Sequence, residues 1–225
     1  NKYPQSEYTN EAKELLVNML ASTNNYKDAL TLLESVKNPS PNARKLYPVV
    51  LYGRATELIN DGMLVSASDL LTKAEADANN TAVLPQIQFW KGEISYRLNK
   101  LDDAIRYFFE YLKRPISYIE INPANANYNL GYCFLKRENY SQALGFFEKV
   151  VKDPKINAGT LEQDAYVRSA DCYYMSRNFK QALAMYDKVI SYSWAAGDYA
   201  TFQKAMITGV NNEKEKISLL ASISR

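Results

Sequence analysis

The side chains that most often carry acid-base catalysis are missing or isolated in this 225-residue chain. It contains no histidine, the residue best suited to proton transfer near neutral pH. The acidic pair Asp102-Asp103 lies where a helix is expected to begin, and carboxylates there interact favourably with the helix dipole. Gly145 and Gly159 stand alone, and no phosphate-binding loop, nucleophile elbow or metal-ligand cluster is present. We therefore predict a non-enzymatic protein with no catalytic, cofactor or metal site.

Tyrosine is the residue type through which this chain is best equipped to recognise a partner. The chain holds 18 tyrosines, each able to cover apolar surface and to form a hydrogen bond. Its 27 basic residues are evenly interleaved with 25 acidic ones, and the net charge of +2 is too small to indicate nucleic-acid binding. No stretch approaches the ~18 consecutive apolar residues of a membrane span, so we expect no direct membrane insertion. A row of tyrosines suits recognition of a protein or peptide segment.

The tyrosines of this chain lie within an internal sequence repeat. Alanines recur at steps of 38, 37, 39 and 39 residues, at Ala29, Ala67, Ala104, Ala143 and Ala182. Large apolar or aromatic residues lie three before and four after each alanine, which marks one face of a helix. Repetition at this period predicts stacked units that cannot bury their apolar faces alone.

Each unit also contains a second helix. Twelve residues before each alanine stands a small or modest residue: Val17, Ala55, Gly92, Gly131 and Ala170. Short polar pairs that suit tight turns lie between the two positions: Asn24-Asn25, Asp61-Gly62, Asn99-Lys100, Glu138-Asn139 and Arg177-Asn178. We predict antiparallel helix hairpins whose small residues let two helix backbones approach closely.

The two cysteines occupy equivalent places in successive units. Cys133 and Cys172 lie 39 residues apart, each two positions after the small residue of its helix. Equivalent sites on stacked helices are roughly 8–10 Å apart, beyond the ~7 Å Cα limit for a disulfide. We predict two buried thiols that act as small apolar residues.

The hairpin pattern resembles the tetratricopeptide repeat. Asn127-Tyr128-Asn129-Leu130-Gly131-Tyr132-Cys133-Phe134, followed by Tyr140, Ala143, Phe147 and Pro154, carries the residues of that repeat at its intervals. The resemblance implies an all-α fold, a right-handed α-α superhelix of stacked antiparallel helix hairpins. We expect a single array over residues 1–225, with units at about 9–38, 43–80, 82–115, 123–154, 159–194 and a partial unit at 198–225. The shortened last unit and the absent initiator methionine lead us to expect a segment of a longer protein or a processed chain.

In arrays of this family the first helix of each pair lines a concave groove that binds a partner segment. The resemblance therefore places a row of aromatic residues in the groove, with Arg97, Lys136 and Arg168 beside it as a polar rim. The predicted partner-binding residues are Tyr52, Phe89, Tyr96, Arg97, Tyr128, Tyr132, Lys136, Arg168 and Tyr174. The alternative for each of the aromatic residues among them is packing between repeats, because aromatic side chains serve both cores and interfaces.

The start of the chain is similar to bacterial cell-envelope members of the family. Tyr3-Pro4-Gln5-Ser6, with Tyr8 and Ala12, follows a Tyr-Pro-x-Ser-x-Tyr-x-x-x-Ala signature of those members. The resemblance implies a place in the bacterial periplasm or at the outer membrane, with a cytoplasmic location as the alternative. We predict a protein-binding scaffold in envelope assembly. The alternatives are a structural spacer, a homodimerisation module, or the accessory region of an enzyme whose catalytic domain lies outside these residues.

Overall fold

The computed structural model describes residues 8–116, 118 and 121–223, and in this part of the chain the regular structure is helical, without strands. The chain divides into two compact units, Asn1–Ile116 (unit 1) and Ser117–Arg225 (unit 2). A single array over all six repeats stays a prediction. The segment Tyr3-Pro4-Gln5-Ser6, which carries the envelope resemblance, lies outside the described residues.

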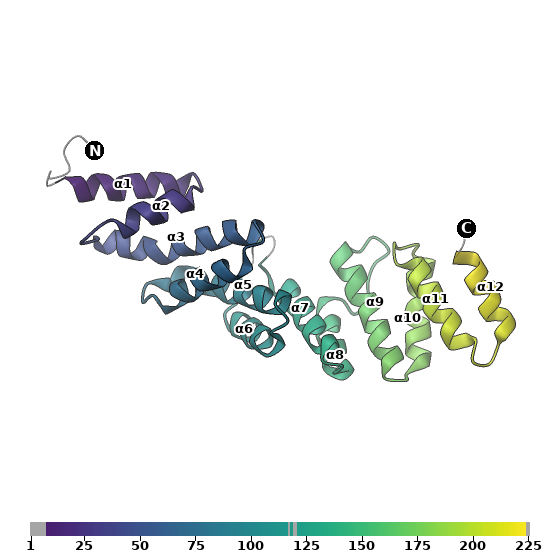
Figure 1. Ribbon diagram of the computed structural model, residues 1–225. Helices are drawn as coiled ribbons and strands as arrows, with labels where there is room; N and C mark the ends of the chain where they lie inside the picture. Colours follow the sequence, from purple (N-terminus) through teal and green to yellow (C-terminus); the bar gives the residue numbers. More distant parts are fainter. Residues whose placement is uncertain (1–7, 117, 119–120, 224–225) are drawn as a thin grey trace. The chain divides into compact units, whose positions relative to one another are not determined.

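Unit 1 consists of successive helix hairpins in which each helix packs against the next (Figure 1). Its helices are α1 (Thr9–Ser22), α2 (Tyr26–Glu34), α3 (Pro41–Asn60), α4 (Leu64–Ala76), α5 (Leu84–Arg97) and α6 (Leu101–Lys113), with a short 3-10 helix η1 (Asn80–Ala82) before α5. The core between α3, α4 and α5 is built from aliphatic side chains, among them Leu51, Leu71 and Ile87, all 0% exposed. This burial holds the hairpins together because no hairpin covers its own apolar face.

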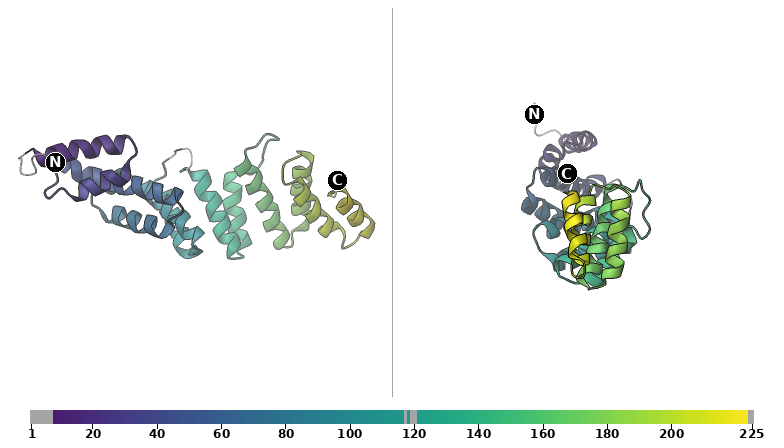
Figure 2. Two further views of the ribbon diagram at one scale, coloured as in Figure 1. Left: turned by 45° about the horizontal axis from the view of Figure 1, so that its top comes forward. Right: turned by 90° about the vertical axis from the view of Figure 1, so that its right-hand side faces the viewer.

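Unit 2 repeats the arrangement, with its helices side by side in both views (Figure 1 and Figure 2). Its helices are α7 (Pro123–Lys136), α8 (Tyr140–Val150), α9 (Thr160–Met175), α10 (Phe179–Ser191), α11 (Gly197–Thr208) and α12 (Glu213–Ile223). The nine-residue connection 151–159 between α8 and α9 is fixed by Trp194, whose Nε1 donates to the carbonyl oxygen of Ile156 at 2.9 Å.

The small residues of the repeat lie where helices meet. All five alanines, at 29, 67, 104, 143 and 182, are 0% exposed. A Cβ atom added to Gly92 would come within 2.9 Å of the Phe108 ring, and one added to Gly131 within 2.6 Å of the Phe147 ring. The close approach that the sequence predicts is therefore confirmed in these two hairpins, and each aromatic ring occupies the space that its glycine leaves open.

The hairpin turns share one backbone conformation. The residue five positions before each alanine has a positive φ: Asn24 (58°), Gly62 (74°), Asn99 (58°), Glu138 (57°) and Arg177 (60°). A left-handed residue ends a helix sharply and lets the chain reverse. Asparagine and glycine adopt this conformation readily, whereas Glu138 and Arg177 adopt it at a steric cost of about 1–2 kcal/mol.

The two cysteines are free thiols and are buried, as the sequence predicts. Both Cys133 and Cys172 are 0% exposed. Burial raises the pKa of the Cys172 thiol to about 12, so the thiol is protonated at neutral pH. Because the thiolate is the reactive form, this cysteine acts as a small apolar residue of the core.

Candidate functional site

A network of charged and phenolic side chains lies in unit 2 and contains three of the predicted partner-binding residues. We name it the Asp164 cluster. Its members come from α7, α9, α10 and α11: Tyr128, Tyr132, Asp164, Arg168, Asp171, Tyr186 and Tyr199.

Helix α9 supplies the charges of the cluster. Asp164, Arg168 and Asp171 are spaced by four and three residues, which places them on one face of a helix. The Arg168 guanidinium donates through Nη1 to Asp171 Oδ2 at 2.6 Å. Its Nε donates to Asp164 Oδ1 at a longer 3.4 Å. The arginine is therefore fixed between two carboxylates of its own helix.

Helix α7 supplies two tyrosines that reach α9. The hydroxyl groups of Tyr128 and Tyr132 donate to Asp164 Oδ2 at 2.8 and 2.5 Å. The Tyr132 hydroxyl also accepts from Arg168 Nε at 3.1 Å. The two rings lie edge to face with centroids 5.0 Å apart, and both contact the Phe147 ring that covers Gly131. The first helices of two successive hairpins are thus joined through one carboxylate.

The inner half of the cluster surrounds Asp171. Its Oδ1 accepts from the Tyr186 hydroxyl of α10 at 2.7 Å and from the Tyr199 hydroxyl of α11 at 2.9 Å. The Asp171 residue is 9% exposed and Tyr186 is 0% exposed, so the bond between them lies inside the protein, whereas Tyr199 is 37% exposed. The Arg168 guanidinium also lies 5.6 Å from the centre of the Tyr199 ring. Burial in this network raises the pKa of Tyr199 to about 12.

The outer half of the cluster is open to solvent. The side chains of Asp164 and Arg168 are 32% and 28% exposed. The pKa of Tyr128 is raised to about 12, mainly by burial of its side chain. The phenol therefore stays a neutral hydrogen-bond donor at neutral pH. The outer half thus offers a fixed carboxylate, a fixed guanidinium and aromatic rings, a set that suits hydrogen bonding to a polypeptide.

We predict that Asp171 makes folding stability depend on pH in the acidic range. Burial raises the pKa of this carboxyl above its ordinary value of 3.8. The hydrogen bond from the Tyr186 hydroxyl and the charge of Arg168 lower the same pKa, but by less than burial raises it. The folded protein therefore binds this proton more tightly than the unfolded chain does. The part of the stability that comes from binding this proton is fully present below pH 3.8 and is lost as the pH rises through the raised pKa.

Urea denaturation between about pH 4 and pH 7 tests this. The free energy of unfolding of the wild type, minus that of Asp171→Asn, is expected to fall as the pH rises. Subtracting the variant removes the titration of all other groups. A difference that is constant or increases with pH contradicts the assignment.

Phe89 does not lie on a surface, contrary to the sequence prediction. It is 4% exposed, and its ring packs edge to face against Phe108 and Tyr111 at centroid distances of 5.7 and 5.4 Å. Its role is packing within the α5–α6 hairpin, and we remove it from the candidate contact residues. Tyr52 of α3 is half-buried and packs against the core between α3, α4 and α5.

The other predicted residues lie at helix ends. Tyr96 is half-buried and Arg97 is exposed at the end of α5, where Arg97 Nε pairs with Glu93 Oε1 at 2.9 Å. Lys136 is exposed at the end of α7. Tyr174, near the end of α9, is half-buried with its ring 5.7 Å from that of Phe179. The Asp164 cluster contains none of these four residues.

The sequence prediction missed Asp164, Asp171, Tyr186 and Tyr199 as cluster members. The spacing of Asp164, Arg168 and Asp171 on one helix face was the available signal. The two tyrosines carried no such signal, because they reach Asp171 from different helices.

None of the described helices combines the length and the apolar character needed to cross a membrane. The same residues include no group of three or more histidine, cysteine or acidic side chains arranged to hold a metal ion.

The stacked hairpins with small residues at their contacts define an α-helical repeat protein. Residues 125–155 and 164–193, which span α7 to α10, match the tetratricopeptide repeat family. Unit 2 therefore contains two tetratricopeptide repeats, and proteins built from this repeat are generally non-catalytic scaffolds for protein interaction. No curated protein matches the sequence.

Solved structures share this fold at low sequence identity. A MamA fragment from Desulfovibrio magneticus is 16% identical with a TM-score of 0.63, covering 79% of this chain and 93% of the fragment. YrrB, described as a tetratricopeptide repeat protein with an unusual peptide-binding site, is 19% identical with a TM-score of 0.59, covering 85% and 90%. PilW, described as a type IV pilus biogenesis factor, is 16% identical with a TM-score of 0.58, covering 97% and 94%. These similarities establish the fold alone.

Proposed function

We propose that the chain is a non-enzymatic protein-interaction scaffold, and that the outer half of the Asp164 cluster binds an extended or helical segment of a partner protein. The observation that carries this proposal is the half-exposed pair Asp164 and Arg168, held in place by Tyr128 and Tyr132. Polar groups that are already fixed lose little conformational entropy on binding. Tyrosine and arginine are also among the residues that most often dominate binding energy at protein interfaces.

The partner segment is expected to supply hydrogen-bond donors to Asp164 and acceptors to Arg168. The cluster contains one guanidinium and two carboxylates, so the carboxylates are in excess. A partner segment that places a backbone N–H group or a basic side chain at Asp164 complements this excess of negative charge. The peptide-binding site in the description of YrrB supports a peptide ligand for this fold. Tyr52, Tyr96 and Arg97 in unit 1, and Lys136 and Tyr174 in unit 2, remain proposed contacts of the same kind.

A peptide selection tests the proposal. The purified chain is presented to a phage-displayed library of random peptides of about twelve residues, and selected peptides are synthesised with a fluorescent label. We expect Asp164→Asn and Arg168→Gln each to weaken peptide binding at least about tenfold. Fluorescence polarisation measures the dissociation constants, and circular dichroism confirms that each variant is folded.

Asp187→Asn is the matched control, because Asp187 lies on α10 in an exposed ion pair with Lys204. The control should bind the peptide as the wild type does. Failure to select any peptide, or equal affinity of all the variants, contradicts the proposal.

We also propose that the partner belongs to the assembly of the bacterial cell envelope, in the periplasm or at the outer membrane. The Tyr3-Pro4-Gln5-Ser6 signature and the similarity to PilW support this placement. Fractionation of the source cells, with an antibody against this chain, tests it. Recovery in the periplasmic or outer-membrane fraction supports the placement, and recovery in the cytoplasm contradicts it.

Dimerisation is the second candidate function, favoured by exposed apolar side chains near the end of unit 2. Phe179, Met206 and Val210 are 43%, 38% and 81% exposed and line a pocket of about 600 Å³ between α10, α11 and α12. Apolar surface of this kind commonly marks an interaction site. Sedimentation velocity over a range of concentrations tests this candidate, and a monomer at every concentration excludes it.

A further inference from the structure

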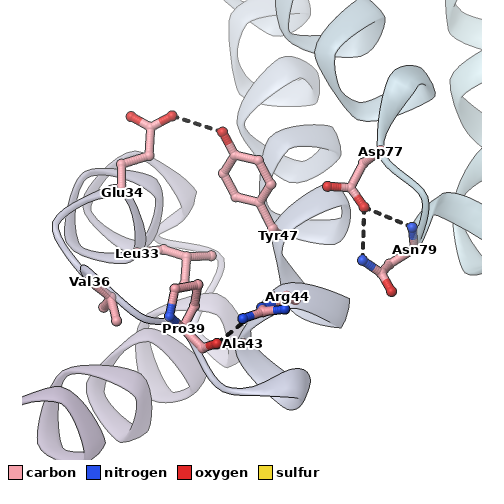
Figure 3. Close-up of a pocket in the computed structure, with 9 residues that line it drawn as sticks. All are labelled: Leu33, Glu34, Val36, Pro39, Ala43, Arg44, Tyr47, Asp77 and Asn79. Carbon is pink, nitrogen blue, oxygen red and sulfur yellow. Dashed lines mark hydrogen bonds between the residues drawn. The ribbon is translucent and has the colours of Figure 1, made fainter.

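Unit 1 contains a separate pocket of about 380 Å³, where α2 ends, α3 begins and the chain turns after α4 (Figure 3). Its apolar wall is formed by Leu33, Val36, Pro39 and Ala43. Leu33, Val36 and Ala43 are buried, so this wall belongs to the core of the unit and is fixed. A volume of this size is typical of sites for small molecules.

One positive charge in the pocket is available to a ligand. Arg44 Nε donates to the carbonyl oxygen of Pro39 at 3.1 Å, which orients the guanidinium. Its terminal nitrogens, Nη1 and Nη2, have no hydrogen-bond or ion-pair partner among the described residues. Two parallel N–H groups of this kind match the two oxygens of a carboxylate.

One negative charge in the pocket is also available. Asp77 Oδ1 accepts from the backbone nitrogen and the Nδ2 of Asn79, at 2.7 and 3.1 Å. Its second oxygen, Oδ2, has no partner among the described residues. Figure 3 shows this oxygen turned away from Asn79, toward the side on which Tyr47 and Arg44 lie. Asp77 is therefore held by one oxygen and free at the other.

The remaining acidic side chain of the pocket is already neutralised. Glu34 Oε1 accepts from Lys73 Nζ at 2.7 Å and from the Tyr47 hydroxyl at 3.0 Å. The hydrogen bond from Lys73 lowers the pKa of Glu34 and keeps it ionised in this pair. The charges left without partners are one guanidinium and one carboxylate, on different walls of one pocket.

We infer that this pocket binds a zwitterion that carries an apolar side chain, either a free amino acid or a short peptide. Its carboxylate pairs with Arg44, its ammonium group with Asp77 Oδ2, and its side chain covers Leu33, Val36 and Pro39. A ligand with only one charge forms only one of these two ion pairs and is expected to bind more weakly. This inference is independent of the Asp164 cluster, which lies in unit 2.

Nuclear magnetic resonance of the whole ¹⁵N-labelled chain tests the inference. L-leucine and L-leucyl-L-leucine are titrated separately to about 10 mM, a range that detects affinities in the millimolar range. We expect shifts of the amide signals of residues 33–47 and 77–79. Stronger binding of leucine identifies a free amino acid as the ligand, and stronger binding of the dipeptide identifies a peptide. No shift with either compound overturns the inference.

Two analogues test the zwitterion on the unaltered protein. Leucinamide lacks the carboxylate and N-acetyl-leucine lacks the ammonium group, and each should bind at least about tenfold more weakly than leucine. Equal binding of either analogue overturns the inference. This comparison does not depend on the folding of any variant.

Paired variants then assign the contacts. Arg44→Gln and Asp77→Asn should each weaken binding about tenfold. Lys45→Gln and Asp69→Asn are the matched controls, because both residues are exposed on α3 and α4 outside the pocket. The controls should bind as the wild type does. Unchanged binding by Arg44→Gln and Asp77→Asn places the ligand elsewhere and overturns the assignment.

Discussion

Replacing Asp171 by alanine is expected to lower the free energy of unfolding by about 3–5 kcal/mol, because three hydrogen-bond donors lose the largely buried carboxylate that they share. The substitution leaves the Arg168 guanidinium without its 2.6 Å partner. It also leaves the hydroxyl groups of Tyr186 and Tyr199 without the acceptor that they share. Because Tyr186 is 0% exposed, water does not replace the lost hydrogen bond.

Urea denaturation followed by circular dichroism measures this change. Asp187→Ala is the control, since the Asp187 side chain is 52% exposed and its ion pair with Lys204 lies at the surface. The control should change stability by less than about 1 kcal/mol. If the two variants lose equal stability, Asp171 is not the centre of a buried network.

Replacing Phe147 by alanine should cost a similar amount, about 3–5 kcal/mol, through the cavity it leaves. Phe147 is 0% exposed, and its ring fills the space above Gly131. The same ring contacts Tyr128 and Tyr132, with centroids 6.2 and 5.4 Å away. The variant is therefore expected to loosen these two tyrosines as well as to destabilise the α7–α8 hairpin.

Thermal and urea denaturation measure the loss of stability, and binding of a selected peptide measures the loss of order at the cluster. Phe202→Ala is the control, because Phe202 is 44% exposed on α11. Its loss should cost less than about 1 kcal/mol. A Phe147→Ala variant as stable as Phe202→Ala contradicts the packing role.

The repeat geometry was predictable from the sequence because it depends on short-range spacing. A glycine twelve residues before an alanine, and an aromatic residue four after it, determine how one hairpin closes, as Gly131 and Phe147 show. The turn residue five positions before each alanine follows from the same local rule. These contacts lie within one hairpin, so the pattern of a single repeat is enough to locate them.

The Asp164 cluster was only partly predictable because its bonds cross between hairpins. Phe89 and Tyr128 both lie three residues before the small residue of their helix, yet Phe89 is buried and Tyr128 is half-buried. The Tyr128 hydroxyl finds an acceptor, Asp164, on the first helix of the next hairpin, whereas Phe89 has no polar group to satisfy. The exposure of Tyr128 thus depends on Asp164, a residue 36 positions further along the chain. The spacing within one repeat does not reveal such a contact.

The central claim, that the Asp164 cluster binds a partner segment, is tested most directly by amide hydrogen exchange. The whole chain is measured alone and saturated with a peptide selected on it. Binding at the cluster predicts slower exchange in α7, α9 and α11, which carry its exposed side chains, with α12 unchanged. Slower exchange confined to α12, or to unit 1, would contradict the claim.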